Sequence, residues 1–280
     1  MRGLLKLVIA IVIALVGAMS YFGSRTTNEV TGEVQHISIA PEQEVALGLQ
    51  ALPEMAQQFG GEVDHPVVSR YVEEVGQRVV RESNAGRTPY QFDFHVLADP
   101  QTVNAFALPG GQVAITVGLL SKLHNEAELA GVLGHEVGHV VGRHGAEQLS
   151  KQQFAQTLVG AIGVAAYDPD RPYSGAQSAA IAAAVAQVVS MRFGREDELE
   201  SDALGVRFMK DAGYNPAGMH SLMQVLAQSG GGRRQPEFFS THPNPENRLS
   251  RIDALIRENG GASGDLGEDR FRENVLRYLR

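Results

Sequence analysis

Cysteine and tryptophan are both absent from the 280 residues. Without cysteine, the chain has no disulfide, no thiol nucleophile and no cysteine-ligated metal site. It also lacks the residue that carries the lipid of a bacterial lipoprotein, although a lack of cysteine does not by itself indicate a compartment. Lysine and arginine do not cluster, and the net charge is -8. General nucleic-acid binding is therefore not expected, because it requires a basic patch.

Long hydrophobic runs are scarce, and the clearest one lies near the amino terminus. Residues 7–22 carry no charge and follow Arg2 and Lys6. As a helix this run would span about 24 Å, short of a hydrocarbon core of about 30 Å unless the preceding leucines join it. It is either an uncleaved anchor or a signal peptide with the cleavage site Ala18-Met19-Ser20. The positive charges favour the inside, so we expect export of the remaining chain.

This predicts a bacterial inner-membrane protein with a single amino-terminal anchor and its main domain in the periplasm. The alternative is a soluble periplasmic protein, released by signal cleavage.

One pentapeptide, His135-Glu136-Val137-Gly138-His139, carries the strongest chemical signal. On a helix, residues four apart lie about 40° from each other and one turn apart, so two imidazoles can bind the same ion. Glu136 projects to one side, where it can reach a metal-bound water as a general base. Asn125 is a plausible N-cap upstream, and acids follow it in the first turn. The pattern predicts a helix from Glu126 to about Arg143.

A catalytic zinc site needs a third protein ligand, and the residues offer two candidates. His144 lies one residue short of the spacing HExxHxxGxxH, but a histidine that ends a helix more often pairs with the helix dipole or is solvated. Glu198 lies on a second expected helix, four residues before Asp202. Glu198 could bind the ion while Asp202 accepts a hydrogen bond from the free N–H of a ligand imidazole. Without the histidine motif, this run would be read as a solvated acidic face.

Four blocks in order carry a family resemblance: Asn104–Gly111, the two metal motifs, and Ser240–Pro243. Over about residues 40–258 the chain resembles the HtpX-type and CAAX-prenyl-protease family of zinc metallopeptidases. It is most similar to the periplasmic β-barrel assembly-enhancing protease-like branch, and we do not expect the helical repeats that follow the peptidase there. The resemblance implies an α+β fold: a mostly helical zincin-type domain with a small mixed sheet whose edge strand lines the cleft, preceded by one hydrophobic helix.

The same resemblance implies one Zn²⁺ per chain, bound by His135, His139 and Glu198. It implies that Glu198 is the glutamate of an E-x-x-x-D pattern that ends at Asp202. His144 falls on a position that is often histidine in the family without being a ligand. The expected activity is a zinc metalloendopeptidase that cleaves unfolded or misfolded envelope proteins, with Glu136 as the general base.

A strand is expected at Gln112–Val117, because Pro109-Gly110-Gly111 signals a turn and the following residues alternate. The resemblance implies an edge strand beside the zinc, on which an extended substrate adds as another strand. We therefore expect Gly111, Val113 and Ile115 to bind substrate. Without the metal motif, the segment would be read as an ordinary core strand.

His242 lies in Ser240-Thr241-His242-Pro243 and has two possible roles. It could be a removable fourth ligand that keeps the resting site closed, or a donor to the oxyanion of the intermediate. Arg248 is a second candidate for the oxyanion role. The plainer interpretation is a loop and helix start capped by Asn244. If His242 stayed engaged, the protein would be a zinc-binding, chaperone-like or autoinhibited protein with little turnover, although the intact Glu136 argues against this.

An apolar fraction of 43% allows a sizeable core. Between the metal motifs, segments 154–166 and 176–189 are rich in alanine and are expected to pack closely as a hairpin. The sequence does not predict an oligomeric state. We expect an anchor or signal peptide at 1–22, a linker at 23–40, the metallopeptidase domain at 41–258 and a tail at 259–280.

Overall fold

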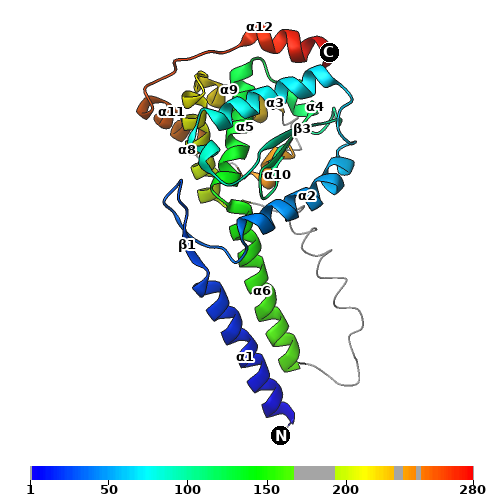
Figure 1. Ribbon diagram of the computed structural model, residues 1–280, viewed down its shortest axis with the longest axis vertical. Coiled ribbons are helices and arrows are strands. Elements are labelled where there is room, and N and C mark those ends of the chain that lie inside the picture. Colours follow the sequence, from blue (N-terminus) through cyan, green and yellow to red (C-terminus); the bar gives the residue numbers. More distant parts are fainter. Residues whose placement is uncertain (1, 167–192, 230–235, 244–246, 280) are drawn as a thin grey trace.

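The computed structural model describes residues 2–166, 193–229, 236–243 and 247–279, which form mostly helices and two small sheets. The α+β class expected from the sequence is confirmed. Two long helices, α1 and α6, project from a body that holds the remaining elements (Figure 1). The helices of the body that matter most for the site are α3 (Pro66–Arg81), α5 (Glu126–Val141), α8 (Arg195–Asp211), α9 (Ala217–Ser229) and α11 (Arg248–Glu258).

The larger sheet has the strand order β3-β5-β4, formed by β3 (Asp93–Leu97), β4 (Ala105–Ala107) and β5 (Gln112–Thr116). β5 is parallel to β3 and antiparallel to β4, so it is the central strand. Every residue of β5 is buried. The sheet is thus mixed, as expected, but its edge next to α5 is β4.

This order corrects the expected substrate strand. Val113 and Ile115 pair with β3 on one side and with β4 on the other. The carbonyl of Gly111 accepts a hydrogen bond from the amide of Asp93 (3.2 Å). None of the three can receive an added strand, because both backbone edges are already paired within the chain. Alternation in the sequence identified a strand, but it contains no information about which strands lie beside it.

Helix α5 is the centre of the body, and all of its residues are buried. It lies directly against α8 because small residues face each other between the two helices. A Cβ on Gly138 would lie 3.0 Å from the carbonyl oxygen of Ser201, and one on Gly134 would lie 3.4 Å from that of Gly205. The glycines therefore allow the backbones to approach closely, which brings the acidic residues of α8 next to the histidines of α5.

Helix α1 (Arg2–Gly23) packs side by side with α6 (His144–Ala166), as Figure 1 shows. The Tyr21 and Phe154 rings stack with centroids 4.7 Å apart. A Cβ on Gly17 would lie 2.6 Å from Thr157, so the helices are in close contact there. Leu4–Gly23 is long and apolar enough to cross a membrane, judged by length and composition.

The expected linker at 23–40 instead forms a hairpin of β1 (Arg25–Thr27) and β2 (Val34–His36). Asn28 Nδ2 donates to the carbonyl of Val141 (2.8 Å), and Gln35 Nε2 donates to that of Gly142 (2.5 Å). These bonds satisfy carbonyl groups that the end of α5 leaves free. The turn-rich composition predicted a tether because it does not reveal this contact with a distant helix.

The carboxy-terminal tail at 259–280 also belongs to the body. The Leu266 carbonyl accepts from the amide of Ala127 in the first turn of α5 (3.0 Å). Arg270 donates two hydrogen bonds to Glu126, at 2.8 and 3.0 Å. Phe271 is completely buried. The segment therefore packs against the start of the metal-motif helix.

The remaining long helices of the body include α2 (Pro41–Gln58), which precedes α3 in the chain. The first alanine-rich segment lies in α6. The second alanine-rich segment and the Asn244 cap lie outside the described residues. The remaining elements are η1 (Asn84–Arg87), α4 (Val117–Leu120), α10 (Phe238–Thr241), α12 (Glu268–Phe271), η2 (Arg272–Leu276) and α13 (Arg277–Leu279).

Candidate active site

Helix α5 presents His135 and His139 on one face, one turn apart. The helix begins as predicted, because the Asn125 side chain accepts a hydrogen bond from the amide of Glu128 (2.9 Å) and caps it. It ends at Val141, two residues before the predicted Arg143. The Nε2 atoms of the two histidines lie 3.1 Å apart. Their lone pairs can therefore point to a common position.

Helix α8 adds Glu198 to this pair. Its Oε1 lies 3.4 Å from His139 Nε2, and its Oε2 lies 3.5 Å from His135 Nε2. In a tetrahedral site with bonds of 2.0–2.1 Å, neighbouring ligand atoms are about 3.3 Å apart. The observed separations are close to that edge length, and all three side chains are buried. The residues present therefore fit a metal ion.

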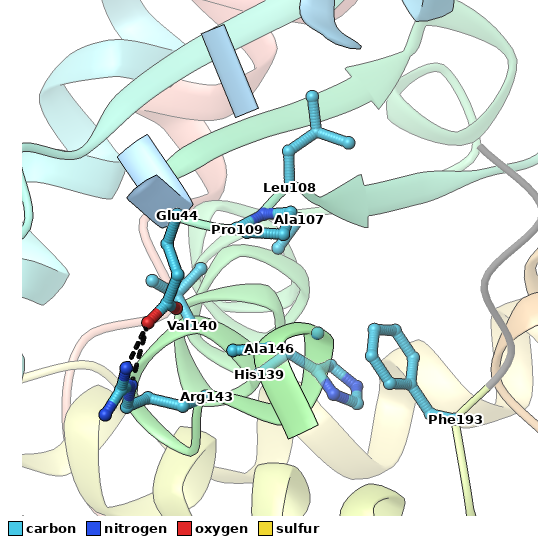
Figure 2. Close-up of a pocket in the computed structure, with 10 residues that line it drawn as sticks. Glu44, Ala107, Leu108, Pro109, His139, Val140, Arg143, Ala146 and Phe193 are labelled. Carbon is cyan, nitrogen blue, oxygen red and sulfur yellow. Dashed lines mark hydrogen bonds and ion pairs between the residues drawn. The ribbon is translucent and has the colours of Figure 1, made fainter. Parts of the chain in front are cut away.

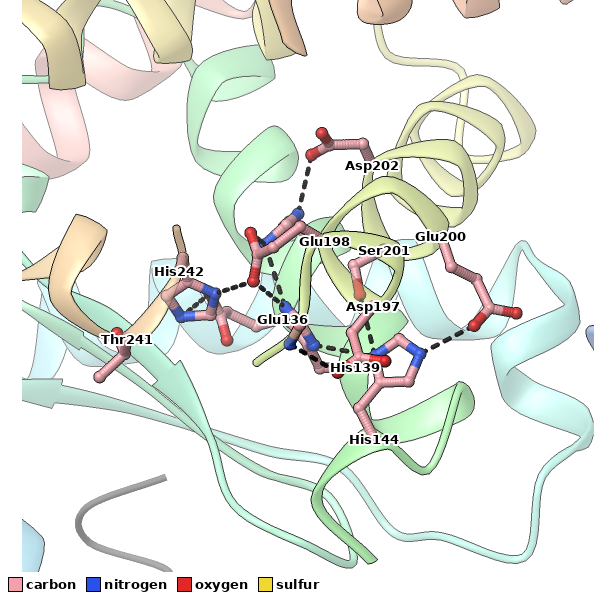
Figure 3. A network of polar contacts seen from close by, with 12 residues as sticks. Glu136, His139, His144, Asp197, Glu198, Glu200, Ser201, Asp202, Thr241 and His242 are labelled. Carbon is pink, nitrogen blue, oxygen red and sulfur yellow. Dashed lines mark hydrogen bonds and ion pairs between the residues drawn. The ribbon is translucent and has the colours of Figure 1, made fainter. Parts of the chain in front are cut away.

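His242 approaches the same position from α10. Its amide donates to the Phe238 carbonyl (2.8 Å), and the two rings stack with centroids 4.4 Å apart. Its Nδ1 lies 3.0 Å from Glu198 Oε1, and its Nε2 lies 3.6 Å from Glu136 Oε1 (Figure 3). Ligand atoms of His135, His139, Glu198 and His242 all lie within 4.8 Å of one another. His242 could therefore be a fourth ligand.

Several buried polar atoms in this cluster have no hydrogen-bond partner among the described residues. They include both carboxylate oxygens of Glu136 and Nε2 of His242. Buried polar atoms without partners are costly, so a native fold rarely keeps several in one place without a ligand. Their convergence is further support for a site that holds a cation and the groups that react beside it.

Glu136 lies beside the four clustered residues but is not a member of their group. It is fully buried, and burial raises the pKa of its carboxyl group against the lowering effect of His242 and His135. The backbone of Ala107 in β4 also interacts with it and lowers the pKa. Glu136 is thus held between the ligand cluster and the edge strand, where a base would act.

Asp202 and Arg248 support the ligands from behind. Asp202 Oδ1 lies 3.0 Å from Nδ1 of His135, which orients that imidazole. Arg248 donates to both oxygens of Asp202, at 2.7 and 2.8 Å, and its Nη1 lies 3.0 Å from Glu198 Oε2. Because the buried guanidinium is committed to two carboxylates, the expected oxyanion role of Arg248 is replaced by a structural one.

His144 is neither solvated nor a member of the ligand cluster. It is buried, and its Nδ1 lies 2.9 Å from Nδ1 of His139. Its Nε2 lies 2.8 Å from Glu200 of α8 (Figure 3). Arg143 precedes it with a φ of 54°, a left-handed conformation that separates α5 from α6. Sequence spacing did not reveal the contact between His144 and Glu200, because the helix was expected to continue to Arg143 without this turn.

His139 also lines a narrow pocket, which lies between β4 and the start of α6 (Figure 2). Phe193 stacks on the His139 ring with centroids 3.9 Å apart, and no sequence signal pointed to it. At the far end, Arg143 is paired with Glu44 of α2, a carboxyl group whose pKa is raised by burial. This ion pair fixes the turn that follows the ligand helix.

The pKa values of the three candidate ligands His135, His139 and Glu198 are shifted in different directions. Burial alone would lower the pKa of His135, but hydrogen bonds and charges of Asp202 and Glu198 raise it to about 9. Burial lowers the pKa of His139 well below its usual value. Burial would raise the pKa of Glu198, yet the charge of His242 and the hydrogen bonds of the three histidines hold it well below its usual range. Without metal, His135 is therefore the candidate ligand that carries a proton near neutral pH.

Residues 66–256 match peptidase family M48. The chain belongs to this family. A β-barrel assembly-enhancing protease of Yersinia pestis is 36% identical over 197 residues, which cover 69% of this chain and 40% of that protein. Mitochondrial metalloendopeptidase OMA1 of Schizosaccharomyces pombe is 28% identical over 246 residues, covering 86% of this chain and 69% of that protein.

Metalloprotease YcaL of Escherichia coli (strain K12) is 29% identical over 174 residues, covering 61% of this chain and 63% of that protein. The match to the Yersinia pestis protein covers less than half the length of that protein. These M48 relatives are named as proteases, and the M48 match includes all of the clustered ligand residues. The domain is therefore that of a metal-dependent peptidase.

Proposed function

We propose that this M48 protein is a zinc endopeptidase that cleaves unfolded or misfolded polypeptides in the bacterial envelope. The observation that carries the proposal is the arrangement of His135, His139 and Glu198 around one position, with Glu136 buried beside it and not engaged as a ligand. Two histidines and one glutamate form a ligand set used by catalytic zinc in peptidases.

When bound, zinc supplies a Lewis acid that polarises the scissile carbonyl and lowers the pKa of a water. The remaining chemistry belongs to Glu136. Its carboxylate accepts the proton of the attacking water and then delivers it to the nitrogen of the leaving amine. Burial raises the pKa of Glu136, which suits a group that must both take and return a proton. Asp202 holds His135 in place during these steps (3.0 Å).

Among the described residues no strand pairs with the outer edge of β4, and this edge is the best candidate for binding the substrate backbone. The Leu108 amide bonds to the carbonyl of Gln112 (2.8 Å), and that of Thr116 bonds to the carbonyl of Asn104 (3.0 Å). Because hydrogen-bonded pairs alternate along antiparallel strands, the backbone groups of Ala107 point away from β5. They lie next to Glu136. An extended polypeptide that pairs there would present a peptide bond to the base, whatever its sequence.

A second function has one observation in its favour. Glu136, Glu198 and His242 are completely buried, and the His242 imidazole lies 3.0 Å from Glu198 and 3.6 Å from Glu136 in this conformation. If the imidazole stays in place, the protein binds zinc but cleaves little, and it acts as a chaperone-like or autoinhibited protein. If His242 moves aside, its imidazole could instead donate to the oxyanion.

Cleavage of an unfolded casein, with and without a chelator, tests the two functions. The wild type is expected to cleave casein, to lose this activity with chelator and to regain it with zinc. Glu136→Gln is expected to keep zinc and lose cleavage; normal turnover by this variant would refute the assignment. If the wild type is inert with zinc bound and His242→Ala is active, autoinhibition is supported. If both are inert with zinc bound, the binding function is preferred.

The helix α1 suggests membrane association, and we propose an inner-membrane anchor with the catalytic domain in the periplasm. Support comes from the exposed apolar side chains along Leu4–Gly23 and from Lys6 near its start. Mass spectrometry of the mature protein tests this, because an anchor keeps its original amino terminus. A mature protein that begins at Tyr21 would instead indicate a cleaved signal peptide.

A further inference from the structure

The two histidine ligands of the proposed metal site are supported in different ways. His135 Nδ1 faces the carboxylate of Asp202 directly, at 3.0 Å, and this pair is completely enclosed. His139 Nδ1 faces a second imidazole, that of His144, at 2.9 Å. His144 in turn faces the carboxylate of Glu200, at 2.8 Å from its Nε2. His139 therefore has a two-residue support that extends from the site to α8.

The hydrogen-bond chemistry allows only one arrangement of protons along this chain when His144 is neutral. A carboxylate can only accept, so Nε2 of His144 carries the hydrogen that is donated to Glu200. The Nδ1 of a neutral His144 is then an acceptor, and His139 must donate to it from its own Nδ1. The lone pair of His139 is thereby left on Nε2, the atom that faces His135 and Glu198.

We infer that Glu200 and His144 are positioning residues that fix the metal-binding tautomer of His139. The inference rests on the proposed metal site and adds to it two residues that lie outside the group of His135, His139, Glu198 and His242. Ser201 contributes a further contact, because its hydroxyl lies 3.3 Å from Nδ1 of His144. We call Glu200, His144 and His139 the relay. Its buried middle residue, His144, is thus contacted from α8 at two adjacent positions.

Glu200 offers a way to test the relay without opening the core. Its side chain is 23% exposed, whereas that of His144 is 1% exposed. It lies in a surface hollow formed by the β1–β2 hairpin, α6 and α8. Replacing Glu200 with glutamine preserves the shape of the side chain but adds an amide donor. Donation from that amide to Nε2 of His144 would favour the opposite tautomer, in which His139 Nδ1 becomes the acceptor.

The test compares the zinc affinity of the full-length wild type with that of Glu200→Gln, by competition with a chromogenic chelator. Loss of a group that supports a ligand imidazole typically weakens metal affinity 10–100-fold, and we expect a change of about this size. The matched control is Glu196→Gln, on the same helix and in the same hollow but without contact to His144. It is expected to bind zinc as the wild type does. The thermal stability of the metal-free Glu200→Gln protein should be unchanged.

A second pair of variants tests the buried half of the relay. His144→Asn can place an amide oxygen near the position of Nδ1, so it should keep most of the zinc affinity. His144→Leu offers no acceptor and should lose affinity at least as much as Glu200→Gln does. With cobalt in place of zinc, the visible spectrum of the leucine variant should shift, while that of the asparagine variant should stay near the wild type. At saturating zinc, we expect KM for casein to be unchanged in Glu200→Gln.

The outcomes are separable. Wild-type zinc affinity in Glu200→Gln would overturn the inference, even if the leucine variant does not fold. A fall in metal-free stability with no change in zinc affinity would assign Glu200 a purely structural role and would also overturn it. Failure of the proposed function would be seen in a different protein: the wild type itself would then bind no zinc.

Discussion

Zinc binding should depend on pH through one ligand, His135. Its pKa is raised to about 9, because hydrogen bonds and charges of Asp202 and Glu198 outweigh the lowering effect of burial. His139 is held neutral by burial, and Glu198 is held ionised by the surrounding histidines. Between pH 6 and 8, these three side chains therefore hold one proton that zinc must displace.

The expected size follows from that single proton. Below the pKa, each unit of pH changes the apparent zinc affinity about tenfold, or about 1.4 kcal/mol. From pH 8 to pH 6 the affinity should fall about 100-fold. The stability of the metal-free protein should change in the opposite direction. A folded-state pKa above that of the unfolded chain stabilises the fold at low pH, and this contribution is lost as pH rises from about 6.5 through about 9.

Calorimetry in buffers of different ionisation enthalpy measures the proton count directly, and chelator competition at several pH values measures the affinity. Asp202→Asn is the informative variant, because the Asp202 hydrogen bond is the first of the causes that raise the pKa of His135. This variant should release less than one proton near pH 8. An affinity that is equal at pH 6 and pH 8, or one that falls with the square of the proton concentration, would refute the reasoning.

Three substitutions test other parts of the site. Glu198→Ala removes one of three ligands, so metal analysis of the purified protein should show reduced zinc, and full occupancy would exclude Glu198 as a ligand. Arg248→Met leaves the buried Asp202 carboxylate without its ion-pair partner, which should cost about 3–5 kcal/mol in urea unfolding; a change below about 1 kcal/mol would show that the pair matters little. Gly138→Val forces α5 away from Ser201 of α8, so the free energy of unfolding should fall by about 1–3 kcal/mol and zinc binding should weaken; preserved zinc affinity would contradict the need for close helix contact.

The clustering of the candidate ligands was predictable because their signals are local. A helix that is capped by Asn125 and carries His135 and His139 on one face follows from capping and periodicity alone. The four-residue spacing of Glu198 and Asp202 gives a second face, and the resemblance to known metallopeptidases connected the two. The structure brings these residues together as expected.

The errors arose where the decisive contacts are distant in the sequence. The alternation of Gln112–Val117 predicted a strand correctly, but strand order depends on pairing with Ala105–Ala107 and Asp93–Leu97. The segment 23–40 was read as a linker because its polar residues suit turns. In the fold, Asn28 uses the same polarity to bond the carbonyl of Val141. Composition cannot distinguish these two uses of a polar side chain.

Helix α8 explains why one short segment supplies so much of the site. Glu198 and Asp202 are four residues apart and face α5 together, one toward the metal position and one behind His135. Glu200 lies between them and, at about 200° around the helix from Glu198, cannot face the same way. It reaches the site only because the turn at Arg143 brings His144 against α8. Asp202 supports His135, and Glu200 supports His139 through His144, so both supports depend on the position of α8 along α5. A shift of α8 against α5 would therefore disturb both histidines and Glu198 at once.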